Sequence, residues 1–255
     1  MRSGNPALNG KTFLDIGSGT VVAGDSGTMT IGGTVNKTAM MLLMLVIAAA
    51  WTWSMVHTDG AGGISLSPML VPVAAGGFIV SLVAFIVMLF KKTWAPVLAP
   101  VYAVAEGLVL GAISAFFELQ FPGIVMQAVM LTFGTLAALL MAYRSGLIKV
   151  TENFKLGVVA ATGAIALLYL VNIGMRLFGF GGMPFIHESG VMGICFSLFV
   201  VTIAALNLVL DFDFIESGAE AGAPKYMEWY AAFGLMVTLV WLYLEILRLL
   251  AKLRD

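Results

Sequence analysis

Seven apolar stretches, each long enough to cross a lipid bilayer, follow one another along this chain. A helix rises about 1.5 Å per residue, so roughly 20 apolar residues cross a hydrocarbon layer of about 30 Å. Only a helix satisfies its own backbone hydrogen bonds within such a segment. The stretches are 38–56, 68–90, 95–117, 123–143, 156–177, 191–215 and 228–250. We therefore expect an all-α membrane protein, a bundle of seven transmembrane helices.

The composition supports a membrane protein and excludes a nucleic-acid-binding one. Hydrophobic residues make up 60% of the chain and charged residues 11%, and the mean hydropathy is +1.01. A soluble domain carries about 25% charged residues. The net charge of -1, with scattered basic residues, gives no cluster that could neutralise a row of phosphates. The loops leave no room for a second folded domain, so we expect one transmembrane domain, 38–255, in the bilayer.

The distribution of lysine and arginine predicts the orientation, because short loops rich in these residues stay in the cytoplasm. With the N-terminus inside, the inner segments hold Arg2, Lys11, Lys37, Lys91, Lys92, Arg144, Lys149, Lys155 and Lys225, and the outer ones hold Arg176, Arg248, Lys252 and Arg254. Nine inside against four outside predicts a cytoplasmic N-terminus. Three of the four dissenting residues lie at the C-terminus, whose side stays open.

Residues 1–37 are rich in Gly, Ser and Thr and show no signal-peptide pattern. Within them, 13–20 look like the glycine-rich turn of a nucleotide or methyl-donor site. Such a turn works only between a buried strand and a helix, with more sheet around it. Here the glycines simply continue toward the membrane, so we expect a flexible cytoplasmic tail and no cofactor.

Polar residues within the apolar stretches are expensive in a bilayer and mark functional sites by default. Glu106 lies in the third stretch, and we weigh a functional role against a hydrogen bond that locks two helices together. Gly107 and Gly111 share one helix face and predict close helix packing. Asn172 and Asn207 are expected to be interhelical hydrogen-bonding residues.

Carboxylates gather at the end of the sixth stretch. Asp211 follows Asn207 by one helical turn, so it shares the face that we expect to point into the bundle. Asp213 lies about 200° round the helix from Asp211, so an unbroken helix cannot aim both at one cavity. The alternative is a solvated acidic loop, which would contain Asp211, Asp213, Glu216 and Glu220.

The seventh stretch carries two further acids, Glu228 at its beginning and Glu245 near its far end. Glu245 and Arg248 are spaced i, i+3 and are able to pair with each other. Glu228 and Glu245 are about 17 residues apart, or roughly 25 Å along a helix. They therefore belong to different depths of the membrane.

Three segments together resemble the transmembrane Bax inhibitor motif family, and in particular its bacterial members similar to Bax inhibitor one. They are Ala-Glu-Gly-Leu at 105–108, the acid and isoleucine at Asp211 and Ile215, and Leu-Tyr-Leu-Glu-Ile-Leu-Arg-Leu-Leu at 242–250. The order of the segments and the number of spans fit as well, so that the likeness covers about 38–250.

The resemblance implies a seven-helix fold with the last helix central, in the bacterial inner membrane. It also implies a pH-sensitive calcium leak controlled by two aspartates on the sixth and seventh helices. Asp211 matches the first aspartate. The second position falls on Glu245 or on Thr238, depending on the anchor of the match, while Glu228 has the depth that best suits Asp211. Calcium would then be the transported ion, bound by ionised oxygens, with candidate carboxylates Asp211, Glu228, Glu245 and Asp213.

Two other functional classes remain in view. Some members of the family are implicated in restraining a membrane-bound quality-control protease, so the protein could act by contact, with the tail as the contacting arm. An intramembrane enzyme is not expected, because His57 and His187 fall in loops and no zinc-type His-Glu-x-x-His occurs.

Overall fold

The computed structural model describes residues 27–255 apart from 59–63, 180, 182 and 184–189. Seven of the described helices are long and apolar enough to cross a membrane. They are α2 (Ile31–Trp53), α3 (Leu70–Phe90), α4 (Ala95–Gln120), α5 (Ile124–Arg144), α6 (Glu152–Leu177), α8 (Val191–Glu220) and α9 (Met227–Arg254). The prediction of an all-α, seven-helix membrane protein is confirmed.

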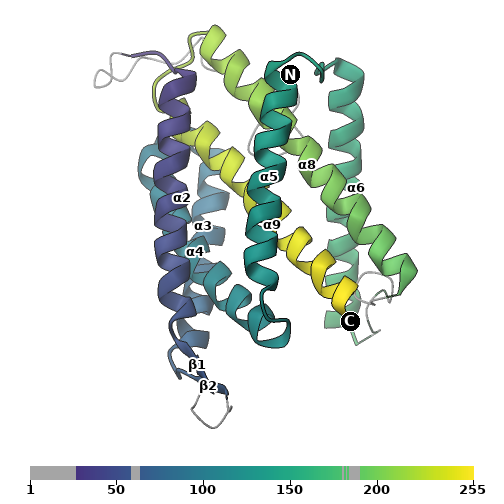
Figure 1. Cartoon of the computed structure of the whole chain (residues 1–255). Helices are drawn as coiled ribbons and strands as arrows, with labels where there is room; N and C mark the ends of the chain where they lie inside the picture. The colour runs from purple at the N-terminus through teal and green to yellow at the C-terminus, as the bar shows by residue number, and fades with distance from the viewer. Residues whose placement is uncertain (1–26, 59–63, 180, 182, 184–189) are drawn as a thin grey trace. The chain divides into compact units, whose positions relative to one another are not determined.

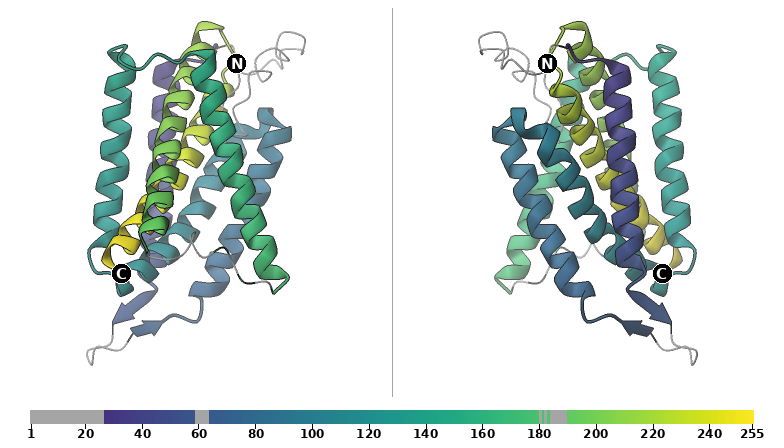
Figure 2. Two further views of the ribbon diagram at one scale, coloured as in Figure 1. Left: turned by 90° about the vertical axis from the view of Figure 1, so that its right-hand side faces the viewer. Right: turned by 90° about the vertical axis from the view of Figure 1, so that its left-hand side faces the viewer.

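Two short elements join these helices. An antiparallel hairpin of β1 (Val56–Thr58) and β2 (Ile64–Leu66) extends beyond the ends of α2 and α3 (Figures 1 and 2). A turn of 3-10 helix, η2 (Lys92–Trp94), connects α3 to α4. The predicted turn at 13–20 and His187 lie outside the described residues.

The first span was predicted with wrong ends. Helix α2 begins at Ile31, where the side chain of Thr30 accepts a hydrogen bond from the Gly33 N–H at 3.0 Å, and it ends at Trp53 rather than at residue 56. Residues 31–37, which we had expected in the tail, are therefore helical. The glycines, Asn36 and Lys37 lower the local hydropathy, but they do not prevent a well-capped helix.

The sixth span is longer than its apolar stretch. Helix α8 continues past the predicted end at residue 215 to Glu220, so its four acidic residues lie on a helix. The alternative of a solvated acidic loop is wrong for this reason. The connection to α9 is the short segment 221–226.

The chain forms two compact units, and α8 and α9 contribute to both. The α2–α4 unit contains the described part of 27–122 together with Ile215–Met236, and the α5–α6 unit contains that of Gly123–Phe214 together with Val237–Asp255. Within the α2–α4 unit, α4 packs against both α2 and α3.

Glycines bring α4 close to α2, as the sequence predicted. A Cβ atom on Gly107 would lie against the Leu45 carbonyl and the Ala48 side chain, and one on Gly111 would collide with Thr52. The first half of α9 also packs into this unit. The ring of Phe233 contacts that of Tyr102 edge-to-face, with centroids 4.9 Å apart.

The core of the α5–α6 unit is apolar. Ile165 of α6 packs with Val200 and Ile203 of α8, and Trp241 of α9 covers this cluster. Helix α9 is the most buried of the seven described helices.

Candidate functional site

Asp211 lies on the buried face of α8. Its side chain is fully buried, and so is that of Asn207 one turn earlier. The Asn207 Nδ2 atom donates to the Thr162 hydroxyl of α6 and to the Ile203 carbonyl, both at 2.8 Å. Its Oδ1 atom is buried and accepts no hydrogen bond from any described residue. This face of α8 therefore places a carboxylate and an acceptor oxygen in a membrane-spanning helix.

Asp213 points elsewhere, as the helical spacing predicted. Its carboxylate lies 2.9 Å from the ammonium of Lys155, which belongs to α6 and is itself buried. Lys155 stands in the first turns of α6, where Thr151 caps the helix, and it is also 3.5 Å from Glu152. Asp213 thus serves an ion pair between α6 and α8 and does not share the face of Asp211.

Glu245 forms a three-residue network with α6. The Tyr169 hydroxyl donates to Oε1 of Glu245 at 2.9 Å. Arg248 donates to both carboxylate oxygens at 2.8 and 2.9 Å, and to the Tyr169 hydroxyl at 2.8 Å. The expected i, i+3 pairing of Glu245 with Arg248 is confirmed, and Tyr169 is a partner that the sequence analysis missed. The buried charge of Glu245 is thereby compensated.

Glu228 receives more donors than any of the other three predicted carboxylates. Its buried oxygens accept from the N–H and the hydroxyl of Thr30, both at 2.9 Å. Lys37 pairs with one oxygen, and Lys225 lies 3.0 Å from the other. A Cβ atom on Gly33 would overlap this carboxylate, so only glycine fits there. Glu228 therefore anchors the beginning of α2 to the beginning of α9.

Backbone pairing strengthens the same junction. The N–H of Met29 donates to the carbonyl of Ala223 at 2.7 Å, and Thr28 forms an antiparallel bridge with Pro224. Gly222, with a φ of 66°, lets the chain turn into this pairing. We call residues 28–30, held by 223–224 and Glu228, the N-terminal clasp.

Glu106 is half-buried on α4, and the side chain of Ser81 on α3 lies near its carboxyl group. This contact agrees with the reading of Glu106 as a residue that locks two helices. Asn172 of α6 is buried, and its side-chain oxygen accepts from the N–H of Met183 at 2.8 Å. This contact holds a loop segment, and the interhelical hydrogen bond expected of Asn172 stays a prediction.

The predicted carboxylates do not form one metal centre in the described part of the chain. No group of three or more His, Cys, Asp or Glu side chains that could hold a metal ion occurs there. Asp213, Glu228 and Glu245 instead have basic or hydroxyl partners on other helices or in loops. The partners that sequence reasoning did not assign are Thr30, Lys37, Lys155, Tyr169 and Lys225.

Comparison with known proteins agrees with the resemblance noted in the sequence. A family model described as Bax inhibitor 1 like matches residues 5–255, which is essentially the whole chain. The match includes all three segments that carry the resemblance. No curated protein and no solved structure matches the chain.

Proposed function

This chain belongs to the Bax inhibitor 1 like family, and we propose that it is a pH-sensitive calcium leak in a bacterial inner membrane, with its N-terminus in the cytoplasm. The controlling groups are carboxylates on α8 and α9, with Asp211 as the group that changes protonation. Calcium is the transported ion, and no catalytic role is assigned to the protein.

The burial of Asp211 is the observation that carries the proposal. A carboxylate at 0% exposure in a membrane-spanning helix is costly to maintain and faces either the bundle interior or a water-containing path. Asp213, Glu245 and Glu228 lie beside cations, namely Lys155, Arg248, Lys37 and Lys225, which hold these carboxylates in place.

The same face offers oxygen ligands. Calcium prefers several oxygens at about 2.3 to 2.6 Å. The Asn207 Oδ1 atom, one turn from Asp211, is a buried acceptor without a donor among the described residues. When Asp211 is protonated, its side chain is neutral and is a poor ligand for calcium. When it ionises at higher pH, it and Asn207 present an anionic, oxygen-rich surface to a passing cation.

Glu245 is the carboxylate of α9 that we assign to this control. Glu245 and Asp211 belong to the same compact unit and both are buried. The Tyr169 and Arg248 partners hold Glu245 in one position, so it acts as a fixed element while Asp211 titrates. Glu228, with its donors from the N-terminal clasp, is assigned a structural role.

The test is calcium flux into liposomes that contain the purified protein and an internal calcium dye. The wild-type flux should rise from mildly acidic to mildly alkaline pH. Asp211→Asn should remove this pH dependence, since the amide cannot ionise. Glu220→Gln, at an exposed carboxylate on the same helix, should retain it. An Asp211→Asn protein with the wild-type pH profile would refute the assignment, and a potassium gradient in place of calcium tests the identity of the ion.

A further inference from the structure

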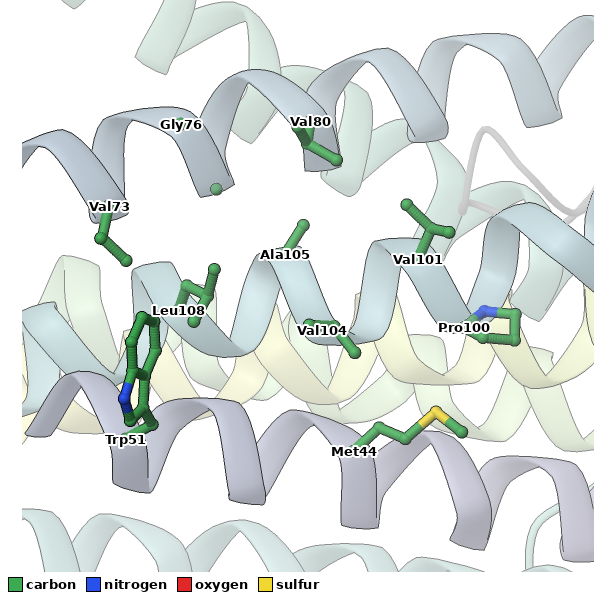
Figure 3. A pocket seen from close by; sticks show the side chains of 11 residues that line it. Met44, Trp51, Val73, Gly76, Val80, Pro100, Val101, Val104, Ala105 and Leu108 are labelled. Atoms are coloured by element: carbon green, nitrogen blue, oxygen red, sulfur yellow. The ribbon is translucent and has the colours of Figure 1, made fainter.

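A groove between α2, α3 and α4 has a nearly uniform apolar lining (Figure 3). Its volume is about 690 Å³, and its lining atoms are almost all carbon. Figure 3 shows the side chains of Trp51 and Leu108 at one end and Pro100 and Val101 at the other. The groove lies wholly within the α2–α4 unit and plays no part in the proposed calcium path.

Helices α3 and α4 approach each other closely at one point of the groove. A Cβ atom on Gly77 would press against the Ala105 carbonyl and the Leu108 side chain, so α3 and α4 touch there. The neighbouring Gly76 also lines the groove, but a Cβ atom on it would meet no atom within 4 Å. The space beside Gly76 is thus unfilled by the protein. Val80 and Val104, both exposed, border the opening.

Basic and aromatic residues lie beyond one end of the groove. Lys91 and Lys92 join α3 to α4, and the exposed Trp94 follows them. The Lys91 ammonium lies 5.1 Å from the centre of the Trp94 ring, and that of Lys92 lies 5.9 Å from the Tyr230 ring. Tryptophan and lysine at a helix end are typical of the lipid headgroup level, and lysines there attract anionic lipids.

The dimensions fit one lipid molecule. Trp94 and Val101 are seven residues apart, which corresponds to roughly 10 Å of helix, about the depth from a headgroup to the first acyl carbons. The lining from Val101 to Leu108 then adds roughly another 10 Å of apolar surface. A hydrocarbon chain needs only dispersion contacts, and the lining offers hardly any polar atoms for a ligand of another kind.

We propose that this groove binds an acyl chain of an anionic phospholipid whose phosphate is held by Lys91 and Lys92. The site selects the lipid by headgroup charge at the α3–α4 junction and retains it by the chain that lies along Gly76. It is a specific lipid site, distinct from the general layer of lipid around the helices.

Photocrosslinking in lipid nanodiscs tests the proposal. The probes are phosphatidylglycerol and phosphatidylcholine analogues with a diazirine in the acyl chain, and labelled peptides are identified by mass spectrometry. Phosphatidylglycerol should label the peptides around Trp51 and Met44 several-fold more than phosphatidylcholine does. Unlabelled phosphatidylglycerol, but not phosphatidylcholine, should compete.

Two pairs of variants separate the chain site from the headgroup site. Gly76→Leu places a side chain in the unfilled space and should reduce labelling roughly fivefold or more, while Gly134→Leu, also at an open position but on α5, should not. The double variant Lys91→Glu, Lys92→Glu should abolish the several-fold preference for phosphatidylglycerol. Lys149→Glu, in the α5–α6 loop, should leave it unchanged.

Several results would overturn the proposal. Equal labelling by the two lipids, or labelling that Gly76→Leu leaves intact, would mean that the groove holds only surrounding lipid. Each variant is first checked for thermal unfolding in detergent, and the competition on wild-type protein decides the matter if a variant does not fold.

Discussion

The hydroxyl of Tyr169 on α6 donates a hydrogen bond to Glu245 on α9, with 2.9 Å between the oxygen atoms. Both residues belong to the α5–α6 unit, and Arg248 closes the network by contacting the two of them. The guanidinium carbon of Arg248 also lies over the ring of Tyr169, 5.5 Å from the centroid of that ring. A buried acid is thus tied across two helices by one neutral and one cationic donor.

Tyr169→Phe should lower the free energy of unfolding by about 1–2 kcal/mol, because it removes a buried hydrogen bond and leaves the carboxylate with Arg248 alone. The measurement is unfolding by SDS in mixed micelles. Tyr226→Phe is the matched control, since the hydroxyl of Tyr226 has no hydrogen-bond partner among the described residues. Combined with Glu245→Gln, the variant should show a coupling energy of about 1 kcal/mol. Strictly additive effects would contradict the network.

The two adjacent glycines of α2 should respond oppositely to alanine. Gly33→Ala puts a methyl group on the Glu228 carboxylate, whereas Gly32→Ala projects into open space. We expect the first to destabilise the protein by about 1–3 kcal/mol through overpacking. The second should be neutral or stabilising by up to about 1 kcal/mol, because alanine favours the helix more than glycine does. Similar melting temperatures for the two variants would argue against the close contact.

A third prediction concerns the α2–α4 contact. Gly111→Ala places a Cβ atom on Thr52 and on the Ala49 backbone, which cannot move away without shifting α2. Stability should fall by about 1–3 kcal/mol. The stability of Gly163→Ala, on α6 with no atom within 4 Å of the added Cβ, should not fall. The comparison is made by thermal unfolding in detergent, and equal losses at the two positions would show that helix propensity rather than packing decides.

The seven spans were predictable because a bilayer requires about 20 apolar residues per helix, and hydropathy records that requirement directly. Helix ends were less predictable. The beginning of α2 depends on the Thr30 cap and on its contact with Glu228, a residue 198 positions away. Helix α8 continues past residue 215 to Glu220, although this segment contains acidic residues. Local hydropathy treats these residues only as polar and therefore ended the span too early.

Contacts within one helix were likewise predictable, and contacts between helices were not. The spacing of Glu245 and Arg248 specified their pairing, and the rotation between Asp211 and Asp213 specified their divergence. The pairs Lys155–Asp213 and Tyr169–Glu245 depend on how neighbouring helices rotate and slide against each other, and no local pattern records this.

The C-terminal cations illustrate a limit of charge counting. Arg248 binds Glu245. Lys252 donates to the Gly193 carbonyl at 3.0 Å and to the Ser197 hydroxyl at 2.9 Å. The first contact lies within α9, and the second joins the end of α9 to α8. A count of positive charges treats such residues as signals of membrane orientation, although they have a structural use within the protein.

The last prediction separates an ion path from a regulator that acts by contact. Removal of residues 1–26 spares the N-terminal clasp, whereas removal of 1–30 deletes Thr28, Met29 and Thr30. The shorter deletion should therefore leave both unfolding and calcium flux at wild-type values. The longer one should lower the melting temperature, since Glu228 loses two donors and α2 loses its cap. Loss of the cap alone should lower the free energy of unfolding by about 1 kcal/mol or more.

The two deletions also test the contact hypothesis without confusing it with instability. If the protein works by restraining a membrane protease through its tail, the shorter deletion should release the protease in a co-reconstituted degradation assay while the melting temperature stays unchanged. If the protein works as a leak, that deletion should alter neither readout, and Asp211→Asn should change flux alone. Loss of flux in the stable, shorter deletion would contradict an ion path confined to the helices, because the helices and the clasp are intact in that variant.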